Sequence, residues 1–211
     1  MAAERFERPG IIGWLHEPRK SPRGTMLLSH GASAGCESPL MVAVAEAFEQ
    51  AGFLVLRWDL PFRQARRSPS LKQQAIDREG IRSTGAVLRE MAPGAPLILA
   101  GHSYGGRQST MVAAEDPSSA DALLLLSYPL HAPQSPESPR TVHFPKLRTP
   151  ALFVHGTRDP FGAIEEMDAA LKLIRGRKKL MVIEGAKHGV PPKTAASLPP
   201  ALVEFLGIGR K

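Results

Sequence analysis

The chain has 211 residues, of which 43% are hydrophobic, and it carries a formal net charge of +7 at pH 7. This length and composition are typical of one globular domain, and no window is long or apolar enough to cross a membrane. The basic residues are scattered, without the basic stripe and interleaved aromatics or the binding module that nucleic-acid recognition requires.

Short apolar runs alternate with amphipathic stretches along the chain, a pattern typical of βα units. Residues 1–24 are expected to form an antiparallel edge strand or hairpin. The expected strands cover Gly10–Leu15, Thr25–Ser29, Phe53–Trp58, Leu97–Ala100, Ala122–Ser127, Ala151–Val154 and Lys179–Ile183. The expected helices cover Pro39–Ala51, Ser70–Met91, Tyr104–Glu115, Gly162–Ile174 and Thr194–Leu206. The series predicts a mostly parallel central sheet with helices on both faces, in a single domain over residues 1–211.

Caps and prolines add detail to this pattern. Ser38, followed by Pro39, and Ser70 are expected to cap the first two helices. Residues 129–150 hold six prolines and no helical period. This segment is therefore expected to be a loop, too short to form a separate lid domain.

The only cysteine, Cys36, has no partner for an intramolecular disulfide. The first ten residues are charged and lack the apolar stretch of a secretory signal. Both observations favour a reducing compartment, so we expect a cytoplasmic location.

Two copies of the pattern Gly-x-Ser-x-Gly surround Ser33 and Ser103, so the motif alone does not identify a nucleophile. A nucleophile elbow needs a strand that runs directly into the serine and a helix that starts directly after it. Strand Leu97–Ala100 leads into Ser103, and a helix can begin at Tyr104. After Ser33, no helix can begin before Ser38. Ser103 is therefore the predicted nucleophile, and the alternative is a glycine-rich turn without chemistry.

The first copy of the pattern has a different expected role, in the oxyanion hole. One donor there is the backbone N–H of the residue after the nucleophile, Tyr104, and a loop after an early strand supplies the second. Ala32 is the candidate for this second donor, with Ser33 close behind. Each donor can lower the barrier by roughly 3 kcal/mol. The alternative is that Gly31 merely permits a tight turn.

A serine nucleophile needs a base that a carboxylate orients. Position eliminates most of the seven histidines. His102 is expected to point away from the nucleophile, and His30 and His155 end strands before a glycine, where a structural role is expected. Three others lie too early or in the proline-rich loop, namely His16, His131 and His143. His188 remains as the predicted base, in a glycine-flanked turn after the last strand; the alternative is a surface histidine without function.

Asp159 is the predicted acid because it is the only aspartate between Ser103 and His188 that follows a strand end. The alternative for Asp159 is a turn residue before proline. Glu184 is the second candidate for the acid, although it ends the strand that leads to the histidine. The four positions Ala32, Ser103, Asp159 and His188 all follow the carboxyl ends of different strands. In an open parallel sheet these ends share one edge, where sites form.

Four stretches resemble a dienelactone-hydrolase-like branch of the α/β-hydrolase superfamily, namely Leu56–Phe62, Gly101–Arg107, Leu124–His131 and Val154–Gly162. This branch includes the hydrolase-like domain of the third subunit of the NSL chromatin complex and its short testis-expressed relatives. The resemblance implies a lidless α/β-hydrolase fold, with Ser103, Asp159 and His188 at the family's serine, aspartate and histidine positions. Dienelactone hydrolases use a cysteine nucleophile, so a serine here argues against that reaction.

The sequence thus predicts a serine hydrolase. The leading hypothesis is a carboxylic-ester hydrolase that acts through an acyl-enzyme on a small ester-like substrate. The side chains of Arg107, Tyr128 and Phe161 are expected to contact the substrate, although an ion pair that holds the elbow helix is an equal alternative for Arg107. We expect no metal or organic cofactor, and neither nucleic acid nor a membrane as partner. The alternative function is a non-catalytic interaction module with the same fold.

Overall fold

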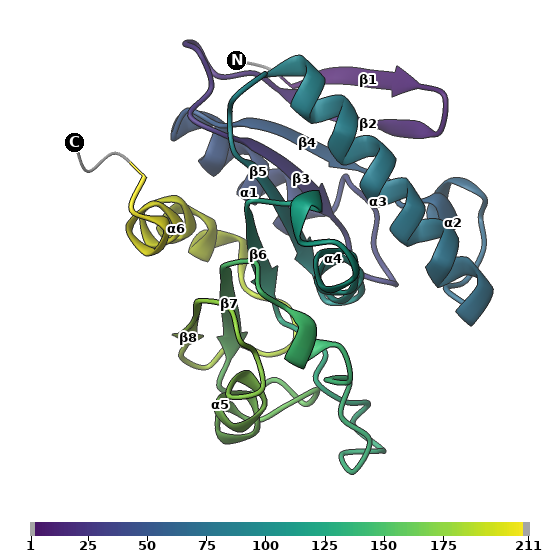
Figure 1. The fold of residues 1–211 in the computed structure, drawn as a ribbon, viewed down its shortest axis with the longest axis vertical. Coiled ribbons are helices and arrows are strands. Elements are labelled where there is room, and N and C mark those ends of the chain that lie inside the picture. Colours follow the sequence, from purple (N-terminus) through teal and green to yellow (C-terminus); the bar gives the residue numbers. More distant parts are fainter. Residues whose placement is uncertain (1–2, 209–211) are drawn as a thin grey trace.

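Eight strands form one sheet in the computed structural model, which describes residues 3–208, and their order is β1-β2-β4-β3-β5-β6-β7-β8 (Figure 1). Strands β1 and β2 form an antiparallel hairpin and β2 pairs antiparallel with β4, whereas all later pairs are parallel. The strands cover Glu4–Arg8 (β1), Ile11–His16 (β2), Thr25–Ser29 (β3), Leu54–Trp58 (β4), Leu97–His102 (β5), Ala122–Leu126 (β6), Ala151–Gly156 (β7) and Lys178–Ile183 (β8).

Helices cover both faces of this sheet (Figure 1). They are α1 (Pro39–Gln50), α2 (Pro61–Gln64), α3 (Leu71–Met91), α4 (Tyr104–Glu115), α5 (Ile164–Leu171) and α6 (Leu198–Leu206). Helices α1 and α6 pack together on one face, and α3, α4 and α5 contribute to the core on the other. The predicted mostly parallel sheet with helices on both faces is confirmed.

Alternating side chains of the central strands build a separate apolar layer on each face. Leu27 and Leu99 pack toward α3 and α4, while Met26, Leu28 and Ile98 pack toward α1 and α6. All five are fully or almost fully buried. A strand covered on both faces is apolar at every position, which is why the sequence shows short continuous hydrophobic runs here.

Two of the expected helices differ from the prediction by more than one residue at an end, each for a local reason. The expected helix Gly162–Ile174 is shorter, because the amides of residues 172–174 bond three residues back and tighten the chain into a turn. The expected helix Thr194–Leu206 is a 3-10 helix at Pro192–Ser197 followed by α6, whose first turn holds Pro199 and Pro200 without N–H donors. The short helix α2 was not predicted.

The two predicted helix caps have different outcomes. The Ser70 hydroxyl accepts a hydrogen bond from the backbone N–H of Gln73 at 3.2 Å. Ser38 occupies the cap position of α1 with extended backbone, but its side chain makes no capping bond. Pro39 at the first helical position still fixes the start of α1.

The proline-rich segment 129–150 is a loop with one 3-10 turn at Phe144–Lys146. Phe144 and Leu147 are buried, so the loop is anchored to the core rather than free. The structure has no separate lid domain within residues 3–208, and the loop instead forms part of the wall beside the carboxyl end of β5.

Candidate active site

Ser103 lies in a sharp turn between β5 and α4. Its backbone has φ 49° and ψ −112°, a strained conformation for a residue with a side chain. Glycines make the turn possible: a Cβ on Gly105 would lie 2.6 Å from the carbonyl oxygen of His30, and one on Gly101 would lie 2.4 Å from the amide nitrogen of Gly106. The strand and the helix therefore approach closely, and the Ser103 side chain is held at the edge of the sheet.

Ser103, His188 and Asp159 form a continuous hydrogen-bonded chain. The Ser103 Oγ lies 2.8 Å from His188 Nε2, and His188 Nδ1 lies 3.0 Å from each carboxylate oxygen of Asp159. A carboxylate only accepts, so the imidazole proton resides on Nδ1 and Nε2 is left to accept from the serine hydroxyl. The arrangement can take a proton from Ser103.

The Asp159 carboxylate is fully buried. It also accepts the backbone N–H of Phe161 at 2.9 Å, which fixes its orientation in the turn after β7. The other candidate acid, Glu184, is exposed and accepts from the Thr157 hydroxyl at 3.2 Å. Asp159 is thus the carboxylate that meets His188.

His102 lies beside His188, which corrects the expectation that it points away from the site. Its Nε2–H donates to the backbone carbonyl of His188 at 3.0 Å, and the two ring centroids are 5.5 Å apart. Burial lowers the pKa of His102, which keeps this second ring neutral near pH 7. Phe161 stacks on the other side, with its ring centroid 4.0 Å from that of His188. His102 and Phe161 together hold the His188 loop over Ser103.

A cavity of about 490 Å³ opens beside Ser103. Its walls include the predicted residues Ala32, Tyr104, Arg107 and Phe161. Tyr104 is the first residue of α4, so its N–H has no acceptor within the helix and is free to face the cavity. Ala32 lies in the exposed turn after β3. The structure therefore places both predicted oxyanion-hole positions on the wall of the cavity beside Ser103.

Tyr128 does not reach this cavity, so the expected substrate contact is wrong for this residue. Ser127 has φ 49° and ends the alternation of β6, and the Tyr128 ring is fully buried against Phe144 and Phe153, at centroid distances of 5.3 and 5.8 Å. The phenol donates to the backbone carbonyl of Arg140 at 2.7 Å. Tyr128 therefore anchors the proline-rich loop.

Three polar side chains of the cavity wall were not predicted from the sequence, namely Gln74, His102 and Arg140. Gln74 comes from α3 and Arg140 from the proline-rich loop, far from Ser103 in the chain. No local pattern marks either residue. His102 was the only one of the three with a local signal, because it lies inside the Gly-x-Ser-x-Gly motif. Its side chain was expected to point away from the nucleophile, but it lines the cavity.

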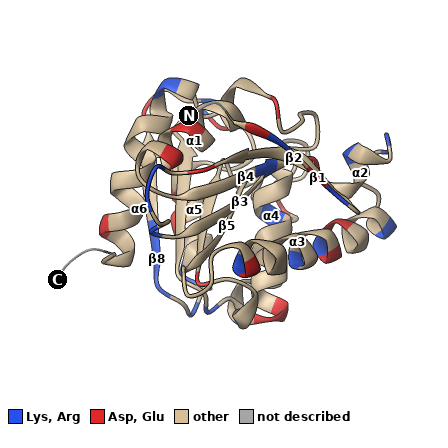
Figure 2. Ribbon diagram, turned by 90° about the horizontal axis from the view of Figure 1, so that it is seen from above, with Lys and Arg blue, Asp and Glu red and all other residues tan. Residues whose placement is uncertain are grey.

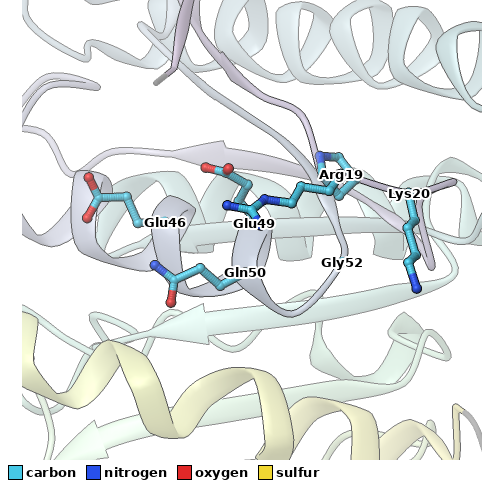
Figure 3. A pocket seen from close by; sticks show the side chains of 7 residues that line it. Arg19, Lys20, Glu46, Glu49, Gln50 and Gly52 are labelled. Atoms are coloured by element: carbon cyan, nitrogen blue, oxygen red, sulfur yellow. The ribbon is translucent and has the colours of Figure 1, made fainter. Parts of the chain in front are cut away.

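A second hollow, of about 630 Å³, lies between the β2–β3 connection and α1 (Figure 3). Figure 3 shows the charged side chains Arg19, Lys20, Glu46 and Glu49 around it. Its lining contains neither a serine nor a histidine. This hollow therefore lacks the groups for nucleophilic catalysis that the Ser103 cavity has.

Charged side chains lie on several elements of residues 3–208. Lysine and arginine occur on α2, α3, α4 and β8, interspersed with acidic residues along α3 (Figure 2). No three histidine, cysteine, aspartate or glutamate side chains in this range converge in a way that could hold a metal ion. No helix of this part of the chain is long and apolar enough to span a bilayer.

Comparison with known proteins gives one family and many structures of the same shape. The family described as "Alpha/beta hydrolase domain" matches residues 22–199. TT1662 from Thermus thermophilus is 24% identical, with a TM-score of 0.77 over 97% of this chain and 98% of its own. Est1E from Butyrivibrio proteoclasticus is 19% identical, with a TM-score of 0.77 over 98% and 100%. A dienelactone hydrolase from Anabaena variabilis is 22% identical, with a TM-score of 0.73 over 93% and 91%. At these identities the likeness concerns the fold.

Proposed function

The chain belongs to the alpha/beta hydrolase domain family, and from this membership we propose that it is a serine hydrolase that cleaves small carboxylic esters. The observation that carries the proposal is the hydrogen-bonded chain from Ser103 through His188 to Asp159 at the mouth of a cavity. This is the arrangement that activates a serine hydroxyl at neutral pH.

The proposed reaction has two stages. His188 Nε2 takes the hydroxyl proton while Ser103 Oγ bonds to the ester carbonyl carbon, and the backbone N–H groups of Tyr104 and Ala32 stabilise the negative charge that develops on the carbonyl oxygen. Collapse expels the alcohol, which receives the proton from His188, and leaves an acyl group on Ser103. Water, deprotonated by His188, then bonds to the acyl carbon; the bond to Ser103 Oγ breaks, the serine oxygen takes the proton back from His188, and the acid leaves. Asp159 holds the imidazole tautomer and stabilises its positive charge throughout.

Cysteine chemistry of the dienelactone-hydrolase type is disfavoured by the surroundings of Cys36. The thiol is buried, and this burial, with the nearby Asp59 carboxylate, raises its pKa to about 12. A thiol that stays protonated is a poor nucleophile. The serine triad therefore remains the proposed chemical centre, and it requires neither a metal nor an organic cofactor.

We also propose a family branch and a cellular location for the protein. The stretches around Ser103 and Asp159 support a place in the dienelactone-hydrolase-like branch that includes the third subunit of the NSL chromatin complex. The unpaired Cys36 supports a cytoplasmic location. The proposed partner is a small ester-like molecule rather than nucleic acid or a membrane.

Hydrolysis of para-nitrophenyl acetate and butyrate tests the function. The folded protein is expected to release nitrophenolate with saturation kinetics, and Ser103→Ala is expected to lower kcat/KM by at least about a thousandfold. Ser33→Ala is the matched control, since it removes the other Gly-x-Ser-x-Gly serine, and it retains activity. If the folded wild-type protein does not accelerate hydrolysis, the chain is better described as a non-catalytic interaction module.

A further inference from the structure

Two arginines share the wall of the cavity that holds the nucleophile. Arg107 lies one turn after Ser103 in α4, and its backbone N–H donates to the Ser103 carbonyl at 2.9 Å. Arg140 comes from the proline-rich loop, which Tyr128 ties down at the Arg140 carbonyl. Both side chains are half-buried and line the cavity with Ser103 and His188. The backbone of Arg107 is thus fixed by α4, and that of Arg140 by the hydrogen bond from Tyr128.

Neither guanidinium forms an ion pair in the described part of the chain. Arg107 Nη1 donates to the neutral Gln74 Oε1 at 3.1 Å, and its buried Nε has no acceptor. Arg140 Nη1 makes only a long contact, 3.4 Å, with the carbonyl of Pro129. Most N–H donors of this pair are therefore left without a protein acceptor.

The carboxylates near the two arginines already have other partners. Asp77, buried beneath the site, accepts from Tyr104 Oη and from the backbone N–H of Phe62. Glu115, at the far end of α4, pairs with Arg78 and Arg82. Among residues 3–208, no carboxylate forms an ion pair with Arg107 or Arg140.

Mutual repulsion makes this unpaired arrangement costly. Burial and the charge of Arg107 both lower the pKa of Arg140, in that order of importance. A guanidinium remains charged at any ordinary pH, so the two groups cannot escape by losing a proton. An anion bound by both groups would relieve the repulsion, and the planar fork of a guanidinium matches the two oxygens of a carboxylate.

We propose that Arg107 and Arg140 form a carboxylate-binding subsite, so that the preferred substrates are small esters that carry a second, ionised carboxyl group. This inference rests on the proposed esterase function and adds the substrate class to it. A cavity of about 490 Å³ is large enough for a small ester of this kind. Binding energy at the arginines would then position the ester carbonyl against Ser103.

Two matched pairs of esters test the subsite. In the first, the carboxylate is on the acyl side: the para-nitrophenyl half ester of adipic acid is compared with its neutral methyl ester. In the second, it is on the alcohol side: the butyryl ester of para-hydroxybenzoic acid is compared with that of its methyl ester. In at least one pair, kcat/KM for the anionic ester is expected to exceed that for the neutral ester by about tenfold or more. This is the change in rate that one charge-assisted hydrogen bond in the transition state would produce.

The variants Arg107→Gln and Arg140→Gln are each expected to lower this anionic-to-neutral ratio about tenfold. Arg175→Gln is the control, because it removes one exposed positive charge at the end of the sheet opposite Ser103 and should leave the ratio unchanged. A preference that falls equally in all three variants would reflect the net charge of +7 rather than the subsite.

Direct binding separates failure of the subsite from failure of catalysis. Ser103→Ala is expected to bind adipate in calorimetry, and the further change of Arg107 and Arg140 to glutamine is expected to weaken binding at least tenfold. Equal hydrolysis within both ester pairs would overturn the subsite and leave the esterase function standing. If no ester is hydrolysed, retained binding supports the subsite alone, and absence of binding to Ser103→Ala overturns it.

Discussion

The phenol of Tyr104 joins the nucleophile helix to a buried carboxylate, and Tyr104→Phe removes this link by deleting one oxygen atom. Tyr104 Oη donates to Asp77 at 2.6 Å. Asp77 is fully buried and has two further donors, the N–H of Phe62 at 2.9 Å and Gln73 Nε2 at 3.2 Å. It forms no ion pair with a described residue. The edge-to-face contact of Tyr104 with Phe62, at 5.5 Å between centroids, survives the substitution.

The expected cost follows from the charge of the acceptor. A hydrogen bond to a charged group contributes about 1.5–3 kcal/mol, whereas a neutral one contributes about 0.5–1.5 kcal/mol. For a domain of this size, each kcal/mol changes Tm by about 2–4 °C, so Tyr104→Phe should lower Tm by about 3–12 °C. Tyr128→Phe is the matched control, because that phenol is also buried but donates to a neutral carbonyl.

Thermal and urea unfolding of the two variants measure this difference. Tyr104→Phe is expected to lose more stability than Tyr128→Phe, with similar m-values, which indicate similar exposed area on unfolding. If Tyr104→Phe is as stable as the wild type, or loses less stability than Tyr128→Phe, the hydrogen bond from the phenol to Asp77 does not contribute the expected stability.

Three further predictions concern the elbow, the acid and the buried thiol. Gly105→Ala is expected to destabilise the fold by about 3 kcal/mol in urea unfolding, because its Cβ would lie 2.6 Å from backbone oxygens of β3 and its connection; an unchanged midpoint would contradict this. Asp159→Asn is expected to lower kcat/KM about 10³–10⁴-fold on nitrophenyl esters, since the amide no longer holds the reactive tautomer, and a loss below tenfold would refute the role. The pKa of the Cys36 thiol rises from 9.0 to about 12 on folding. The stability contributed by the protonated thiol is therefore fully present below pH 9. As pH rises from 9 toward 12 the unfolded chain loses this proton first, so the free energy of unfolding falls by about 1.4 kcal/mol per pH unit. Cys36→Ala should therefore flatten the alkaline loss of unfolding free energy between about pH 9 and about pH 11, and an equally steep loss would contradict the assignment.

Local sequence patterns were sufficient to predict the sheet and the elbow. The run Leu97–Ala100, the glycines around Ser103 and the helix after it are contiguous in the chain, so their geometry follows from neighbouring residues. The same is true of Ser70, which caps α3 as expected. Asp159 and His188 were predicted because each follows the end of a strand, and the strand ends of a parallel sheet converge on one edge.

Long-range packing explains what the sequence did not show. Tyr128 follows an apolar strand, yet the positive φ of Ser127 interrupts the alternation and the ring enters the core. Arg140 and Gln74 reach the cavity only because the proline-rich loop and α3 fold over α4. Neither position carries a local motif, and their proximity to Ser103 is a property of the tertiary fold.

Labelling with a fluorophosphonate probe reports whether Ser103 is an activated nucleophile. One covalent adduct is expected, and peptide mass spectrometry should locate it at Ser103. Labelling should persist in Ser33→Ala, slow markedly in His188→Ala and disappear in Ser103→Ala. A folded wild-type protein that stays unlabelled, or an adduct located at Ser33, would show that Ser103 is not the activated nucleophile.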